Sequence, residues 1–340
     1  MFIVKDIIHW LSRRRLKLIV LLAAAAWSTV WVWPSTKLKI IFCSVGQGDA
    51  AVVSRGFTQV LIDAGPPSSK TSDCLSRHLP FFDRRLEAVI VSHPQTDHFG
   101  GLPQVLGRYL VEKFIFNGLA GDSRAWADLS RLVEKEGSRI ITLSAGDKLK
   151  IGQVEIDVLW PKKSCELCVM GYGSGVSSED EPSQPVLGVA SSRDLNADGL
   201  IFKLAYGNFS ALFTGDIGER EEIEMAKTAA MAKTAENSNH SNRSNHLTVL
   251  KVAHHGSKTS SSVEFLAAVR PELAVIEVGK NSYGHPADEV IERLTTVGAK
   301  VFRTDKDGDV VVETDGKKWQ IKAQKSKFKY QNLVQNSKPM

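Results

Sequence analysis

The sequence S-H-P-Q-T-D-H-F-G-G at residues 92–101 directly follows a mostly apolar run, Leu86–Val91, which is typical of a buried strand. It places His93, Asp97 and His98 within one short turn. Imidazole and carboxylate groups at this spacing can bind one divalent cation, and the glycine pair allows the backbone to pack closely behind it. A solvated loop that caps a strand would look similar. The choice between the two depends on whether complementary groups occur elsewhere.

Complementary groups do occur downstream and upstream, at the ends of other predicted strands. The segments are G-Q-G-D at 46–49, L-F-T-G-D at 212–216, K-V-A-H-H-G-S at 251–257 and N-S-Y-G-H-P at 281–286. Each segment alone is typical of a turn or a helix cap. Together they predict acids and imidazoles at the mouth of one sheet, where metal sites form. The segments contribute Asp49, Asp216, His254, His255, Ser257, Asn281 and His285.

The order of apolar runs predicts the fold class. Strands come first and then alternate with helical stretches, which favours an α/β (α+β) fold of stacked sheets flanked by helices over a simple parallel sheet. The predicted strands are Leu38–Phe42, Ala50–Val53, Val60–Ile62, Leu86–Val91, Phe114–Phe116, Val154–Leu159, Leu200–Leu204, Ala211–Phe213, Leu247–Val252, Leu273–Val278 and Lys300–Phe302.

The chain has 340 residues, of which 43% are hydrophobic, enough for one large core or two modest ones. We expect a basic segment with a membrane anchor at 1–35, one folded domain with the predicted metal site at 36–323 and a basic tail at 324–340. Two stretches read as surface insertions. The first, about 164–196, is rich in Gly, Ser, Pro and acids, and the second, about 225–246, contains a duplicated M-A-K-T-A and Ser-Asn triplets.

The amino terminus predicts a membrane anchor. Leu18–Trp33 is an apolar block preceded by Arg13–Arg15 and Lys17. At ~1.5 Å per residue it measures about 24 Å, shorter than a ~30 Å hydrocarbon core. The stem of Lys17 and the tryptophans of the block can bridge the difference at the interface. The upstream positive charges predict a cytoplasmic amino terminus and an extracytoplasmic domain. A signal peptide cleaved near Ala23–Ala26 and a buried soluble helix are the alternatives.

Four cysteines permit a disulfide without requiring one. Cys165 and Cys168 form a single C-x-x-C, which lacks the second pair that a structural zinc site needs. In an exported domain this pair could be oxidised.

Six lysines between 317 and 329 form a basic run near the carboxyl terminus. Such a run can attract phosphate backbones or anionic lipid. We expect instead a solvated, poorly ordered tail.

The ordered motifs resemble a known superfamily. H-x-x-x-D-H-x-G-G, F-T-G-D and H-H-G-S are similar to the motifs of metallo-β-lactamase fold hydrolases. V-G-Q-G-D-A, L-I-D-A-G, N-S-Y-G-H-P and F-R-T-D-K-D-G extend the resemblance to the C-terminal domain of the ComEC competence DNA-uptake family, over roughly residues 38–315. The resemblance implies a four-layer αββα sandwich with metal at one edge, here preceded by one N-terminal transmembrane helix.

The resemblance also implies roles for individual residues. Asp216 would bridge two metals or serve one, Asp97 would orient the attacking water as base, and His285 would act as ligand or proton donor. The implied metal ligands are His93, Asp97, His98, Asp216 and one of His254 or His255. The implied substrate or supporting residues are Asp49, Asp63, Gln95, Ser257 and Asn281.

Two departures from the superfamily pattern limit the metal site. Gln95 stands where a second histidine is usual, and no histidine occurs between His98 and His240. One subsite would keep His93 and Asp216 only, whereas the other keeps Asp97, His98, Asp216 and a histidine. We therefore expect one firm divalent cation, zinc or manganese, and an uncertain second site.

Three functions fit these features. The first is a membrane-anchored phosphodiesterase or nuclease that acts on DNA during competence. The second is a hydrolase of a small-molecule ester, lactam or phosphoester, and the third is a non-catalytic accessory module. A chain with one apolar segment cannot form a pore, so transport would need a separate channel protein. No nucleotide cofactor is expected.

Overall fold

The computed structural model describes residue 17 and residues 34–162, 187–190, 194–228, 247–324 and 329–331. Contacts divide the chain into a unit Met1–Ser35 and a compact unit Thr36–Met340. The predicted anchor at 18–33 and the Cys165–Cys168 pair lie outside the described residues. Among the residues described, none of the helices combines the length and the apolar character that a membrane crossing requires.

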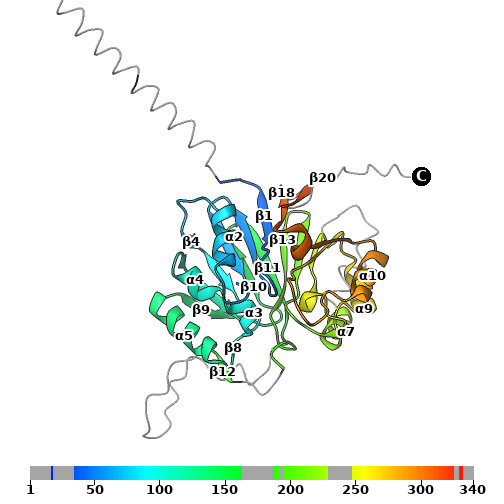
Figure 1. Ribbon diagram of the computed structural model, residues 1–340, viewed down its shortest axis with the longest axis horizontal. Coiled ribbons are helices and arrows are strands. Elements are labelled where there is room, and N and C mark those ends of the chain that lie inside the picture. Colours follow the sequence, from blue (N-terminus) through cyan, green and yellow to red (C-terminus); the bar gives the residue numbers. More distant parts are fainter. Residues whose placement is uncertain are drawn as a thin grey trace, which may run out of the picture. The chain divides into compact units, whose positions relative to one another are not determined.

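Two mixed sheets form the centre of the described part of the compact unit (Figure 1). The first sheet has the strand order β20 (Lys329–Gln331), β19 (Trp319–Ala323), β18 (Val310–Thr314), β1 (Leu38–Phe42), β2 (Ala51–Arg55), β3 (Thr58–Ile62), β5 (Ala88–Ile90), β7 (Lys113–Phe116) and β9 (Arg139–Thr142). The second has the order β10 (Lys148–Ile151), β11 (Val154–Trp160), β13 (Ile201–Tyr206), β14 (Phe209–Phe213), β15 (Val249–Lys251), β16 (Leu273–Ile276) and β17 (Lys300–Arg303). Short pairs join β4 (Arg85–Leu86) to β6 (Leu110–Val111) and β8 (Leu119–Ala120) to β12 (Val189–Ala190).

Apolar side chains lie on both faces of the central strands, which places three apolar layers in the domain. In β1, Phe42 points between the sheets, where its ring stacks 6.0 Å from that of Phe213 in β14. Its neighbour Ile41 points to the opposite face and packs in a second cluster. Since side chains alternate along a strand, both faces of this sheet need an apolar cover.

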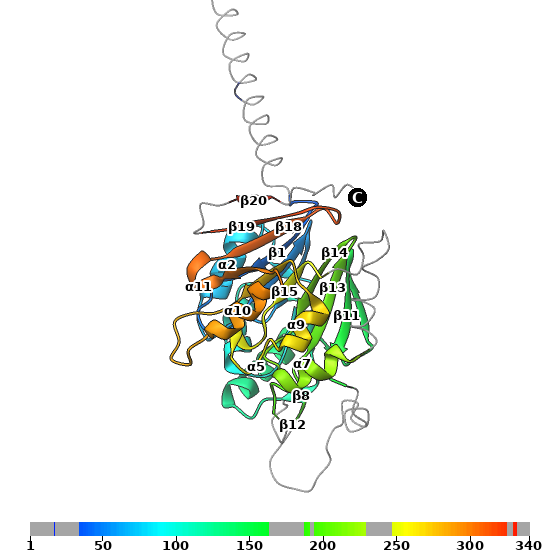
Figure 2. The same ribbon diagram turned by 90° about the vertical axis from the view of Figure 1, so that its right-hand side faces the viewer.

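Helices provide that cover on the outer face of each sheet (Figures 1 and 2). The first sheet is covered by α2 (Lys70–His78), α4 (Leu102–Leu106) and α5 (Arg124–Glu136), and the second by α7 (Glu219–Ala226), α9 (Val263–Val269) and α10 (Asp288–Thr296). Trp126 of α5 is fully buried against the first sheet, and Phe265 of α9 is fully buried against the second. The predicted four-layer αββα fold is confirmed.

The strands that apolar runs predicted are present, with ends shifted by a few residues. The run Leu86–Val91 is divided between β4 and β5 by Glu87. Eight of the described strands were not predicted: β6, β8, β9, β10, β12, β18, β19 and β20. β10 carries two exposed lysines and β19 carries one, so neither strand has a continuous apolar run.

The prediction of a poorly ordered basic tail is wrong for its first half. Lys317 and Lys318 lie in the turn between β18 and β19, and Lys322 pairs with Val311 inside the sheet. The buried side chain of Ile321 holds β19 against the core. These lysines are therefore exposed positions of a regular hairpin.

The two predicted insertions also contain packed residues. Leu187 is buried beside α5, and its carbonyl accepts a hydrogen bond from the indole N–H of Trp126 at 2.9 Å. Met225 is buried as part of α7. The polar composition of these two segments did not reveal that Leu187 and Met225 pack against the core.

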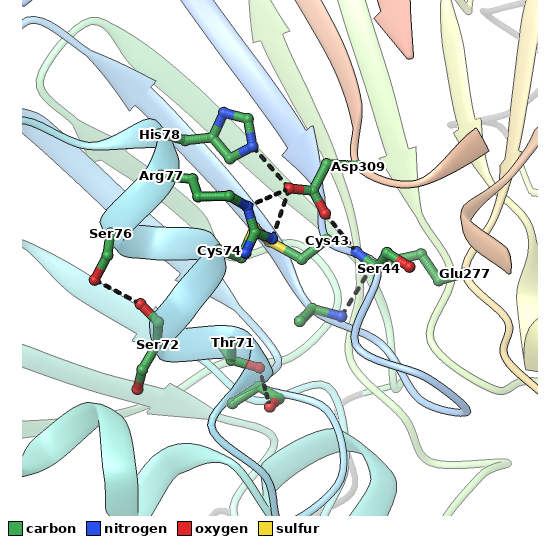
Figure 3. The surroundings of a disulfide bond; sticks show 12 residues. Cys43, Ser44, Thr71, Ser72, Cys74, Ser76, Arg77, His78, Glu277 and Asp309 are labelled. Carbon is green, nitrogen blue, oxygen red and sulfur yellow. Dashed lines mark hydrogen bonds and ion pairs between the residues drawn. A yellow bond between two sulfur atoms is a disulfide. The ribbon is translucent and has the colours of Figure 1, made fainter. Parts of the chain in front are cut away.

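One disulfide ties the start of a functional loop to a covering helix (Figure 3). Cys43 directly follows β1, and Cys74 lies in α2, with a sequence separation of 31 residues. Both cysteines are fully buried. The loop after Cys43 leads to Asp49, so the disulfide fixes the point from which this loop leaves the sheet.

A buried carboxylate beside the disulfide makes a second cross-connection (Figure 3). Asp309, just before β18, accepts hydrogen bonds from the backbone N–H of Ser44 at 2.9 Å and from the Arg77 guanidinium at 2.7 Å. His78 Nε2 lies 2.9 Å from the same carboxylate. Burial opposes the charge, but these partners lower the pKa of Asp309 to about 2. Three separate chain segments are therefore joined behind the loop.

We expect the double variant Cys43→Ala/Cys74→Ala to unfold more easily than the wild type. Loss of a cross-link that closes a loop of this size lowers the free energy of unfolding by about 3–4 kcal/mol. Denaturant unfolding followed by circular dichroism measures the difference. A reducing agent should lower the wild-type midpoint towards that of the variant and leave the variant unchanged. Equal midpoints for oxidised wild type and variant would contradict this expectation.

Candidate metal centre

The site forms where loops leave the carboxyl ends of parallel strands in both sheets. Strands β3 and β5 are parallel and lead to Asp63 and to His93, respectively. Strands β14 and β15 are also parallel and lead to Asp216 and to the histidine pair 254–255. Because parallel strands end at the same edge, residues distant in sequence converge here.

Four of the predicted ligands lie together. Asp97, His98, Asp216 and His255 each offer one ligand atom, and these atoms all lie within 4.8 Å of one another. Asp216 Oδ2 is 3.3 Å from His98 Nε2 and 3.4 Å from His255 Nε2. Asp97 Oδ2 is 3.3 Å from the same His255 nitrogen. The described cluster therefore joins both sheets through two imidazoles and two carboxylates.

The far nitrogen of each imidazole is held by a partner that orients the ring. His98 Nδ1 lies 2.9 Å from Asp63 Oδ2, and His255 Nδ1 lies 2.9 Å from the backbone oxygen of Glu277. A proton on Nδ1 is thereby favoured, and Nε2 faces the cluster, where a bound metal would take the place of its proton. Metal-binding histidines are usually fixed in this way.

His93 has a similar arrangement beside this group. Its Nδ1 lies 3.0 Å from Ser92 Oγ, and its ring centre is 4.1 Å from that of His98. Burial, together with the neighbouring His98, lowers the pKa of His93 to about 3. The ring is therefore neutral at physiological pH. Its Nε2 is buried without a hydrogen-bond partner, as is that of His98.

The charges around the cluster are suited to a bound cation. Burial opposes protonation of His98 and His255, yet the carboxylates of Asp216 and Asp49 raise the pKa of both imidazoles well above the ordinary value. A bound divalent cation would replace these protons as the positive charge. Asp216 Oδ1 is a further buried atom without a hydrogen-bond partner. The donor set of nitrogens and oxygens therefore fits a divalent metal.

A buried lysine lies beside the cluster, and the sequence analysis did not identify it. The Lys251 ammonium forms a close ion pair with Asp49, lies 3.7 Å from Asp216 Oδ1 and donates to the Gly215 carbonyl at 3.0 Å. Burial opposes its charge, but the surrounding carboxylates raise its pKa. Lys251 is thus a permanent positive charge next to the metal cluster.

Glu277 is a second buried ionisable residue beside the cluster that could not be recognised as part of the site from the predicted motifs. Its Oε1 accepts a hydrogen bond from the Ala50 N–H at 2.9 Å, and the side chain is buried. Burial and the neighbouring Asp49 raise the pKa of Glu277 well above its ordinary value. Both Lys251 and Glu277 interrupt otherwise apolar runs, V-L-K-V-A and A-V-I-E-V, and this interruption was the available signal.

Two further, partly exposed histidines form the outer side of the site. His254 Nε2 is 4.0 Å from Asp216 Oδ2, and its side chain is 31% exposed. The ring of His285 lies 5.7 Å from that of His254, and its Nδ1 is buried without a hydrogen-bond partner. Burial and the nearby His254 and His255 lower the pKa of His285. Of the paired histidines, His255 therefore lies in the cluster and His254 at its edge.

The remaining predicted residues lie in the loops around the site. Gln95 precedes α3 (Thr96–Phe99), and its carbonyl accepts a hydrogen bond from the N–H of His98 at 2.9 Å. Ser257 Oγ is 3.0 Å from Thr259 Oγ1 within its turn. Asn281 donates to the His285 carbonyl at 2.8 Å and accepts from the His285 N–H at 3.0 Å. Asn281 therefore positions the loop that carries His285.

Strained and crowded backbone is concentrated at this edge. Asp63, His254 and His255 have φ values of 54°, 49° and 54°, in the left-handed region that is unfavourable for side chains other than glycine. Such conformations persist where the surroundings enforce them, often at functional sites. A Cβ at Gly101 would lie 2.2 Å from the Ala64 carbonyl oxygen, so the glycine pair does allow close packing behind the turn.

Comparisons with known proteins give one superfamily model and several relatives that this chain is similar to. Residues 43–160 match the model of the metallo-beta-lactamase superfamily. ComE operon protein 3 from Bacillus subtilis is 26% identical over 304 residues, covering 83% of this chain and 34% of that protein. Competence protein ComA from Neisseria gonorrhoeae is 26% identical over 278 residues, covering 81% of this chain and 32% of that protein. Among solved structures, the metallo-beta-lactamase fold protein YhfI from Bacillus subtilis aligns with a TM-score of 0.48 at 12% identity, covering 82% of this chain and 100% of that chain.

The described part of the chain has the metallo-β-lactamase fold, with the candidate metal centre at one edge of its two sheets. The resemblance to the ComEC competence family is also confirmed, because its relatives match most of this chain. The chain spans about a third of the length of the curated relatives it matches.

We expect Lys251→Met to destabilise the domain strongly. Removing one partner of a buried ion pair leaves Asp49 without its nearest positive charge, which costs about 3–5 kcal/mol. Lys203→Met is a matched control, because Lys203 lies half-buried in β13 of the same sheet, opposite the partly exposed Asp157 in β11. Denaturant unfolding of the metal-free proteins measures both effects. Similar losses in the two variants would contradict the role assigned to Lys251.

We expect Asp216→Asn to bind much less metal than the wild type. Asp216 contacts both cluster histidines, so its loss removes the shared carboxylate and should weaken binding at least tenfold. Metal content after equilibrium dialysis against zinc or manganese, measured by plasma mass spectrometry, reports this directly. Asp128→Asn, at an exposed position of α5, should retain wild-type metal content. Equal metal content in all three proteins would exclude this cluster as the binding site.

Proposed function

We propose that this chain is a membrane-anchored, metal-dependent phosphodiesterase that cleaves DNA outside the cytoplasm during DNA uptake. The observation that carries the proposal is the convergence of Asp97, His98, Asp216 and His255 in a domain related to a competence protein. In this proposal, DNA is the substrate and a separate protein contributes the channel.

The cluster supports hydrolysis. A divalent cation bound there supplies Lewis-acid polarisation of a phosphoryl oxygen and acidifies a nearby water. Asp97 is the partly exposed acid of the cluster, with its side chain 34% accessible. Burial opposes its charge, but the bond to His255 and the nearby His98 lower its pKa to about 2. The ionised carboxylate can therefore orient a water and accept its proton.

The exposed histidines favour an anionic substrate. At neutral pH the lowered pKa leaves His285 uncharged, and an uncharged imidazole cannot protonate a leaving group efficiently. A phosphodiester anion bound beside it would raise that pKa again, because an opposite charge nearby stabilises the protonated ring. His285 can therefore donate a proton when the substrate is an anion. A neutral ester or lactam does not raise the pKa of His285 in this way.

Residues at the mouth of the site support binding of a polynucleotide. Tyr283 is 74% exposed, and its ring lies 5.7 Å from that of His285. Lys258 and Lys280 are exposed on the two loops that carry His254 and His285. Exposed aromatic rings stack on unpaired bases and lysines contact phosphates, a combination typical of single-strand binding.

The cysteines support a location outside the cytoplasm. Disulfides such as Cys43–Cys74 form and persist in oxidising compartments and are rare in the cytosol. The basic residues before the apolar block Leu18–Trp33 favour the same orientation. Both features fit a domain that meets DNA on the outer side of the membrane.

We expect the full-length protein loaded with manganese or zinc to cleave labelled DNA. The assay compares single-stranded DNA, double-stranded DNA, a phosphodiester dye and a cephalosporin. Asp97→Asn and Asp216→Asn should each reduce cleavage at least 100-fold, because each removes a cluster carboxylate. Asp128→Asn, the exposed control in α5, should cleave at the wild-type rate.

The other outcomes identify the alternative functions. Turnover of the dye or the cephalosporin without cleavage of DNA would show a small-molecule hydrolase and overturn the DNA assignment. Metal binding without turnover of any substrate would show an accessory module. Cleavage that persists in both cluster variants would place the activity elsewhere.

A further inference from the structure

Three phenylalanine side chains gather on the surface at one end of the sandwich. Phe57, Phe81 and Phe82 are 46%, 71% and 50% exposed. The ring of Phe82 lies 5.3 Å from that of Phe81 in an edge-on contact and 6.4 Å from that of Phe57. An exposed cluster of large apolar rings is unusual on a soluble surface and marks an interaction site. We call these three residues the phenylalanine patch.

Strand register places this patch at the end where β1 begins. Lys39 in β1 pairs with Ser54 near the end of β2, and β2 then turns at Gly56–Phe57 into β3. The metal cluster lies at the opposite end of the same strands, because β3 leads away from Phe57 towards Asp63. We call the end where β1 begins the Leu38 end. The patch and the catalytic site therefore face in opposite directions along the strands.

The loop that carries two of the rings is held in place. Asp83 accepts a hydrogen bond from the Gln59 amide at 2.8 Å, and its backbone N–H donates to the Pro80 carbonyl at 3.0 Å. The tight turn between Pro80 and Asp83 presents Phe81 and Phe82 outward from the end of α2. The rings are thus displayed by a braced turn, which preorganises them for contact.

Positive charge lies on the same end of the domain. In β18, Thr314 pairs with Leu38, so the following turn with Lys317 and Lys318 lies at the Leu38 end (Figure 2). Both lysines are exposed, as is Arg84 beside the phenylalanine patch. The first strand therefore begins between an aromatic cluster and a basic turn. This combination matches the interfacial region of a bilayer with anionic head groups.

We infer that the Leu38 end docks on an anionic lipid bilayer, with the phenylalanine patch inserted among the head groups and the basic turn against their phosphates. The inference rests on the membrane anchoring in the proposed function and extends it. The apolar block at 18–33 ends a few residues before β1, so an anchored chain brings this end of the domain to the bilayer. The metal cluster then opens away from the lipid, towards DNA.

Photo-crosslinking of the full-length protein tests the docking. The probe is p-benzoylphenylalanine in place of Phe81, in vesicles of phosphatidylethanolamine and phosphatidylglycerol, with lipid adducts measured by mass spectrometry. The matched control carries the same probe in place of Tyr283, which has similar exposure but lies beside the metal cluster. We expect at least tenfold more lipid adduct from position 81 than from position 283. A probe in place of Phe82 should behave like that at 81.

Three outcomes would each overturn the docking. They are equal adduct yields at positions 81 and 283, the absence of lipid adducts at positions 81 and 82, and adducts at position 81 with protein only. Flotation of the vesicles and DNA cleavage are measured on the same samples. Protein that floats and cleaves DNA without lipid adducts at 81 refutes the docking alone. Protein that does not float refutes both the anchor and the docking. Lipid adducts without DNA cleavage refute the nuclease and leave the docking supported.

Discussion

The imidazole of His98 between two buried carboxylates is the interaction on which the site depends. Asp63 belongs to the end of the first sheet and Asp216 to the end of the second, and His98 contacts both. One ring therefore links the two halves of the sandwich at the position where a metal would bind. Apolar packing between the two sheets holds them together in the core, whereas ionic contacts of His98 connect them at the metal cluster. Any shift of one sheet against the other would separate these groups.

Buried charge at this edge has to be balanced within the protein, because water is excluded from most of it. Asp49, Asp63 and Asp216 are almost completely buried. An isolated buried carboxylate is strongly unfavourable. His98, His255 and Lys251 supply the compensating positive charge, and the raised pKa of Glu277 removes one negative charge. These charges are fixed in place by the fold. Because the carboxylates outnumber the positive groups that are not imidazoles, several imidazole nitrogens face inward towards them.

Much of this could be predicted from the sequence, because strand ends and ligand types are local features. The apolar runs located most central strands, and the motif of His93, Asp97 and His98 located half of the site. Long-range geometry could not be predicted. The pairing of Cys43 with Cys74 depends on how α2 packs against β1. The choice between His254 and His255 depends on the left-handed backbone conformation of these two successive residues, which sets where each ring points.

Two features of the site disfavour a second metal ion. One is the charge on Lys251, and the other is the glutamine at position 95, where the superfamily usually has a histidine. Asp216 uses Oδ2 towards His98 and His255, while its Oδ1 lies 3.7 Å from the Lys251 ammonium. A second cation bridged by Asp216 would have to share Oδ1 with that ammonium, and at such distances like charges repel. Gln95 provides no imidazole to compensate. Both features disfavour a second cation at Asp216 Oδ1 and leave the side of the carboxylate that faces the two histidines as the one open to a metal.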